Sequence, residues 1–162
     1  MNLILKKTML GVIMIITITA TNAWVHGDMM ANICNATRDN MSFEKTRAYQ
    51  ADTADDSSAK FNLPSGSCHT INFWIQWQSN GWDIDDQITF IETSKPAKGQ
   101  FNVKVVDFTT DIFFVTTDLV TRIVDFNMPN YVATIRDGVW SSELIIGGMS
   151  HSVLLVISPL KK

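Results

Sequence analysis

The chain has 162 residues, of which 46% are hydrophobic and 18% are charged, and its formal net charge is −3. This length suits one ordinary domain rather than two, and the apolar fraction excludes a disordered or collagen-like chain. The mildly acidic balance, without a basic block, argues against a nucleic-acid partner.

The amino terminus predicts an export signal. Lys6 and Lys7 precede an apolar run over residues 8–20, and small residues near Ala23 suit a signal peptidase. The run is too short for a membrane anchor, because its helix would span about 20 Å of a hydrocarbon core of about 30 Å. We therefore expect a signal peptide at 1–23 and one secreted or periplasmic domain at 24–162. Cleavage would leave no stable transmembrane segment.

Cleavage after Ala23 would create a possible metal site at the new amino terminus. The mature chain would begin Trp24-Val25-His26. A free amine with histidine in third place can hold Cu(II) or Ni(II) in a square plane, through the amine, two backbone amide nitrogens and the imidazole. The sequence thus raises a hypothesis of copper binding by His26 with Trp24 and Val25.

The two cysteines predict a disulfide. Cys34 and Cys68 both lie in the mature domain, and one bridge is the ordinary expectation in an oxidising compartment. We expect them to face each other across adjacent strands. A metal site or catalytic thiol is the alternative, but the pair lacks the spacing of such sites.

The first third of the domain is ambiguous. Residues 31–35 and 42–49 favour strands, although 43–49 could equally form a helical turn. Residues 50–59 are predicted to be a polar, acidic loop, and 63–67 a turn before Cys68.

The clearest strand covers residues 70–77. Its odd positions are apolar and form one face, whereas Asn72 and Gln76 lie on the other. Asn80-Gly81 then predicts a tight turn, and 87–92 the returning strand.

The rest of the chain alternates β-rich segments with turn residues. Strands are expected over 101–105, 112–117, 119–126, 131–136, 139–146 and 152–157. We predict a turn at Met128-Pro129-Asn130 and a hairpin turn at Asp137-Gly138. Gly147-Gly148 is expected to end the strand that follows. The continuous apolar run over 152–157 predicts a strand buried on both faces, near the middle of the protein.

About nine short strands with turn residues between them favour an all-β fold, a single antiparallel β-sandwich. A closed β-barrel is the alternative. The named catalytic motifs are absent: the sequence contains no HExxH, GxSxG, Walker A or GxGxxG pattern.

Acidic and aromatic residues gather around residue 80. Asp83, Asp85 and Asp86 could wrap calcium, although their spacing is not that of an EF-hand and a solvated turn is the alternative. Trp74 and Trp82 could form an exposed aromatic surface beside them, unless a second sheet covers both rings.

The leading hypothesis is a secreted or periplasmic, non-enzymatic binding domain that uses this surface. A protein, a glycan or a lipid surface would each suit it as partner. Two alternatives remain open. One is a membrane-active, toxin-like small β-sandwich, since tryptophan favours the membrane interface. The other is a hydrolase whose site follows no known motif.

Overall fold

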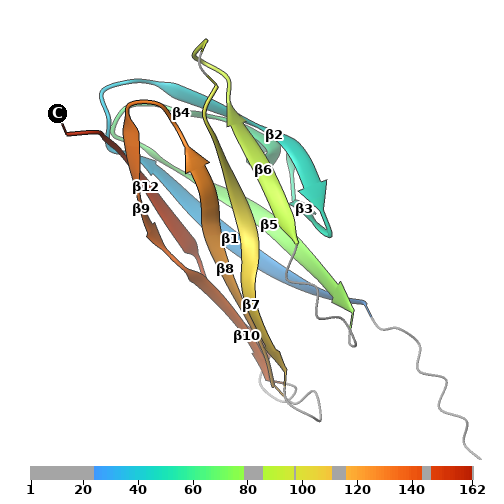
Figure 1. Cartoon of the computed structure of the whole chain (residues 1–162). Helices are drawn as coiled ribbons and strands as arrows, with labels where there is room; N and C mark the ends of the chain where they lie inside the picture. The colour runs from blue at the N-terminus through green and yellow to red at the C-terminus, as the bar shows by residue number, and fades with distance from the viewer. Residues whose placement is uncertain (1–23, 79–85, 97, 111–115, 144–146, 162) are drawn as a thin grey trace, which may run out of the picture.

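The computed structural model describes residues 24–78, 86–96, 98–110, 116–143 and 147–161 (Figure 1). The expected signal peptide at 1–23 and the turn predicted at Asn80-Gly81 lie outside these residues.

The described residues form two β-sheets packed face to face (Figure 1). In spatial order, the first sheet contains β3 (Ala51–Thr53), β5 (Cys68–Gln78), β1 (Trp24–Asn35), β12 (Val153–Pro159) and β9 (Tyr131–Arg136). The second sheet contains β11 (Gly147–His151), β10 (Gly138–Glu143), β8 (Thr116–Asn127), β7 (Gln100–Thr110), β6 (Gln87–Glu92), β2 (Met41–Tyr49) and β4 (Lys60–Leu63). The all-β sandwich predicted from the sequence is confirmed, with one parallel pair, β1 and β12, among the antiparallel ones.

The core lies between the sheets and follows from period-two alternation along the strands. On β5, Ile71, Phe73 and Ile75 are buried, as their spacing predicts. On β2, Phe43 is buried and alternates with partly exposed neighbours. Residues 43–49 are therefore strand, and the helical alternative is wrong.

The segment at 50–59 is more ordered than its polar composition predicts. It contains the short strand β3 and a single helical turn, α1 (Asp56–Ala59). The Asp55 carboxylate caps that turn by accepting a hydrogen bond from the Ser58 backbone N–H at 2.7 Å. Hydrogen bonds from Ser57 and Ser58 lower the pKa of Asp55 to about 2. The prediction of a loop without regular structure was wrong, because polar residues in this segment form hydrogen bonds with each other that stabilise a helical turn.

The predicted hairpin at Asp137-Gly138 is also wrong. Strand β9 pairs with β12, whereas β10 pairs with β8 and β11, so the chain passes from one sheet to the other at this point. Gly138 is required there by space. A Cβ atom would lie 2.8 Å from both the His151 carbonyl oxygen and the Val153 nitrogen. Gly138 therefore allows two segments of the chain to approach closely and does not form a turn.

Two further boundaries differ from the prediction. Gly147 and Gly148 begin strand β11 instead of ending the strand before it, because β11 pairs back onto β10. Thr116 and Thr117 join the residues up to Asn127 in the single strand β8.

Strand β12 lies between β1 and β9, inside its sheet as expected. Val153, Leu155 and Ile157 are fully buried, but Leu154 and Val156 on the other face are only half-buried. The expectation of burial on both faces was wrong, because only the inner face of this sheet meets the second sheet.

The predicted disulfide is confirmed. Cys34 on β1 lies directly opposite Cys68 on β5, with their Cα atoms 4.0 Å apart. Within the described residues, no helix has the length and apolar character needed to cross a bilayer.

Candidate functional site

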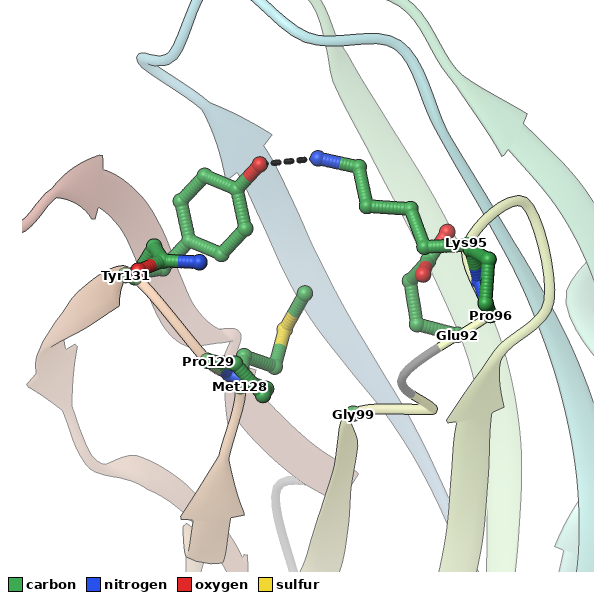
Figure 2. A pocket seen from close by; sticks show the side chains of 8 residues that line it. Glu92, Lys95, Pro96, Gly99, Met128, Pro129 and Tyr131 are labelled. Atoms are coloured by element: carbon green, nitrogen blue, oxygen red, sulfur yellow. Dashed lines mark hydrogen bonds between the residues drawn. The ribbon is translucent and has the colours of Figure 1, made fainter.

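Three connections meet at one end of the sandwich: 36–40 between β1 and β2, 93–96 with 98–99 between β6 and β7, and 128–130 between β8 and β9. They enclose a hollow of about 300 Å³, which we call the loop-end pocket (Figure 2). It is lined by Glu92, Lys95, Pro96, Gly99, Met128, Pro129, Asn130 and Tyr131. A second, more open hollow of about 690 Å³ adjoins it and shares Lys95, Asn130 and Tyr131.

The floor of the pocket depends on a close contact between two of these loops. The Glu92 N–H donates to the Gly99 carbonyl at 2.8 Å and closes the connection between β6 and β7. Gly99 then lies so near the next loop that a Cβ atom would be 2.5 Å from Met128 Cγ. Asn130 adopts a positive φ of 70°, and the Tyr131 N–H donates to the Met128 carbonyl at 3.2 Å. The turn predicted at 128–130 is thus confirmed, and it aims Tyr131 at the pocket.

A three-residue cluster joins the loops at the mouth of the pocket. The Lys95 ammonium donates to Asp39 Oδ2 at 3.0 Å and to the Tyr131 hydroxyl, which in turn donates to Asp39. The same ammonium lies 4.7 Å from the centroid of the Tyr131 ring, a cation–π distance. Figure 2 shows the bond between Lys95 and Tyr131 bridging the two sides of the pocket.

The cluster shifts the pKa of each of its members. Hydrogen bonds from Tyr131 and then Lys95 lower the pKa of the Asp39 carboxyl. Burial by itself would lower the pKa of Lys95, but the bonds to Tyr131 and Asp39 outweigh it and raise that pKa. Burial and the bond to Asp39 raise the pKa of Tyr131. Near neutral pH the cluster is therefore an ion pair bridged by a neutral phenol.

The wall opposite Tyr131 holds a buried carboxylate. Glu92 is 1% exposed, and its Oε1 accepts from the Ser94 N–H at 2.9 Å, from the Ser94 hydroxyl and from the Ser42 N–H at 3.4 Å. Figure 2 shows the carboxylate below the Lys95 backbone, while the Lys95 ammonium reaches away toward Tyr131.

The loop that carries Asp39 is fixed from beneath by Asn35. This side chain is 1% exposed, and its amide nitrogen donates to the carbonyls of Asp39 at 2.7 Å and Leu63 at 3.0 Å. Its carbonyl oxygen accepts from the Thr37 N–H at 2.9 Å and hydroxyl at 2.6 Å. Because Asn35 directly follows Cys34, the disulfide and this amide together anchor the loop.

None of the site residues predicted from the sequence lines the loop-end pocket. Trp74 is half-buried on β5, on the face away from the core, and Asp86 is 2% exposed just before β6. Trp82, Asp83 and Asp85 lie outside the described residues. The aromatic and acidic surface therefore stays a prediction.

The predicted metal site also stays a prediction. Trp24, Val25 and His26 pair along their backbones with Gln78, Trp77 and Gln76 of β5. A square-planar complex uses the amide nitrogens of Val25 and His26, so it would have to compete with this pairing. Within the described part of the chain, no group of three or more His, Cys, Asp or Glu could hold a metal ion, calcium included.

Sequence reasoning missed the pocket because Asp39, Glu92, Lys95 and Tyr131 form no local motif. One signal was available at Glu92. It ends the strand whose inward positions are Ile88 and Phe90, and period two places Glu92 on the same inward face. A carboxylate at an inward position is unusual, because burying its charge is costly.

Comparison of the chain with protein-family models, curated proteins and solved structures gave no match. The function is therefore argued from the geometry of the loop-end pocket.

Proposed function

We propose that the chain is an exported, non-enzymatic binding domain that holds a small ligand in the loop-end pocket. The observation that carries the proposal is the convergence on one hollow of about 300 Å³ of Glu92 and Lys95, from the end of β6 and the connection after it, with Tyr131, which begins β9. Small-molecule sites are typically concave and largely apolar, with a few convergent polar groups. A hollow of this size suits a ligand comparable to an amino acid or a monosaccharide.

Export is supported by two independent features. The leader pattern before Ala23 is typical of a signal peptide, and the bridge between Cys34 and Cys68 is typical of oxidising compartments. We therefore place the domain in the periplasm or outside the cell.

A binding role, as opposed to catalysis, is supported by the state of the polar groups. Asp39 and Lys95 satisfy each other as an ion pair, so neither is poised to transfer a proton. His69 stacks on Phe61 at 4.3 Å between ring centroids and bonds to the Ser57 carbonyl, away from the pocket. The polar groups at the pocket are therefore engaged with one another in hydrogen bonds and an ion pair, which favours recognition over catalysis.

The test is a thermal-shift screen of amino acids, amines, sugars and lipid headgroups against the mature protein. A ligand present at 100 times its Kd stabilises the folded state by about 2.7 kcal/mol, which a melting curve resolves. Tyr131→Ala should abolish the shift, because it removes the ring and the bridge across the mouth. The matched control is Tyr49→Ala, which removes an exposed tyrosine elsewhere. Ligands whose shift survives Tyr131→Ala would overturn the proposal for this pocket.

The surface predicted around Trp74, Trp82 and Asp83–Asp86 is a second candidate for binding. Trp74 shares the outer face of its sheet with Met30, which is 42% exposed, so apolar surface is present there. Trp74→Ala should then weaken attachment to a protein, glycan or lipid surface at little cost in stability. Flotation with liposomes separates the membrane-active alternative, and unchanged binding by Trp74→Ala in every assay would remove this surface.

A further inference from the structure

We infer that the ligand of the loop-end pocket has an apolar body and one carboxylate, and that Arg38 binds this carboxylate in the adjoining hollow. The inference rests on the proposed function and specifies its ligand. The adjoining hollow, of about 690 Å³, shares Lys95 and Tyr131 with the loop-end pocket. The two hollows therefore meet at these side chains, and one ligand can extend from the first into the second.

Arg38 brings an unneutralised positive charge to the adjoining hollow. It is exposed and lines the hollow, and within the part of the chain that the structure describes its guanidinium has no hydrogen bond or ion pair. The connection that carries it is held in place, because the buried Asn35 amide donates to the Asp39 carbonyl at 2.7 Å. A planar guanidinium presents parallel N–H groups that match the two oxygens of a carboxylate.

Lys95 adds a second donor where the two hollows meet. An ammonium has three N–H groups, and among the described residues two of them donate, to Asp39 Oδ2 and to the Tyr131 hydroxyl. The third is left for a ligand oxygen.

The charges that line the adjoining hollow favour a carboxylate over a phosphate. They are the two positive charges of Arg38 and Lys95 and the negative charge of Asp39, a balance of one positive charge. A carboxylate neutralises that balance, whereas a phosphate monoester carries a charge of about −1.5 to −2 at neutral pH and exceeds it.

The loop-end pocket suits the apolar body of such a ligand. Pro96, Met128 and Pro129 line it and present apolar surface, so each methylene buried there strengthens binding. Glu92 lines the same pocket, and its carboxylate repels a second one. The charged end of the ligand is therefore directed out of the loop-end pocket and toward Arg38.

The test compares three probes of one chain length, hexanoate, hexanol and hexylammonium, by ligand-observed NMR with the mature protein at low salt. Hexanoate should bind most tightly. Arg38→Gln should weaken hexanoate by about fivefold and leave hexanol unchanged, because it removes the charge and keeps a polar side chain. Arg136→Gln is the matched control, since this exposed arginine at the far end of β9 lines neither hollow, and it should change nothing.

A second variant should act in the opposite direction. Asp39→Asn removes a negative charge from the adjoining hollow, so it should strengthen hexanoate binding severalfold. Glu44→Gln, at an exposed carboxylate paired with Lys60, is its control and should have no effect. Hexanoate binding that stays the same in Arg38→Gln and in Asp39→Asn would overturn the inference.

The place of the apolar body is tested by chain length and by Tyr131. Acetate should bind much more weakly than hexanoate, because it lacks the methylenes that fill the loop-end pocket. Equal binding of hexanoate and hexanol, or no binding of hexanoate, would also overturn the inference. Hexanol binding that Tyr131→Ala abolishes would still support the proposed function, so the failure of the inference and the failure of the proposed function are distinguishable.

Discussion

The interior of the sandwich is filled by apolar side chains, whereas its loop end places polar side chains around a hollow. Between the sheets, rings such as Phe43 and Phe101 pack at 5.4 Å between centroids and fill the space with apolar surface. At the loop end, the buried Glu92 lines a hollow together with the polar side chains of Lys95 and Tyr131. Well-packed apolar surface stabilises a fold, whereas polar groups around a cavity suit a ligand. Stability and binding should therefore respond to different substitutions.

The largest effect is expected in the interior. Phe43→Ala should lower the free energy of unfolding by about 3–5 kcal/mol, because it leaves a cavity next to Phe61 and Phe101. Denaturant titration measures it. Tyr49→Ala is the matched control, since it removes an aromatic ring that is 45% exposed from the same strand, and its cost should stay within about 0.5 kcal/mol. Similar losses in both variants would contradict the contrast drawn between interior and surface.

The disulfide should give the next largest effect, at the boundary between the two regions. Replacing Cys34 and Cys68 with alanine should cost up to about 4 kcal/mol, the chain-entropy value for a loop of this length. Denaturant midpoints with and without reductant measure the loss. Because Asn35 and the loop to Asp39 adjoin Cys34, the variant should also be cleaved faster by protease between residues 36 and 40. Free thiols in the purified protein would contradict the bridge.

The interior was largely predictable from the sequence, because its signals are local. Alternation of Ile71, Phe73 and Ile75 indicates burial of one face, and two cysteines after a predicted export signal favour a disulfide between them. The point at which the chain passes from one sheet to the other was not predictable. Asp137-Gly138 has the composition of a hairpin turn, yet the partner of each flanking strand is chosen by packing far away in sequence.

The loop end was less predictable for the same reason. Its turn at 128–130 was predicted, but Asp39, Lys95 and Tyr131 meet only because β1, β6 and β8 end at the same edge of the sandwich. No spacing in the sequence records that meeting. Side-chain contacts between loops depend on sheet topology, which short-range patterns do not determine.

A smaller effect is expected where the chain changes sheets. Gly138→Ala should cost about 1–3 kcal/mol, because its Cβ would overlap backbone atoms of His151 and Val153 that cannot move independently. Gly66→Ala is the comparison: its Cβ would meet open space, so only the strain of its positive φ of 72° applies. Thermal unfolding ranks the two. Hydrogen exchange should also speed up in β9 and β12 of the first variant alone, and unchanged exchange there would argue against a packing role for Gly138.

The smallest effect should come from the charges at the loop end, and it should depend on pH. The pKa of Asp39 is lower in the folded protein than its ordinary value of 3.8, so its carboxylate stabilises the fold above that value and loses the contribution as pH falls through the folded pKa. The pKa of Lys95 is raised above 10.5, so its contribution is complete below that value and fades as pH rises further. The melting temperature of Asp39→Asn should therefore lie below that of the natural protein between about pH 5 and 9, and the gap should narrow as pH falls below 3.8. Added salt should shrink this gap, because Asp39 is exposed and screened, whereas it should leave the cost of Phe43→Ala unchanged. A gap that does not narrow as pH falls below 3.8, or that does not change with salt, would mean that Asp39 acts through packing, as the interior residues do.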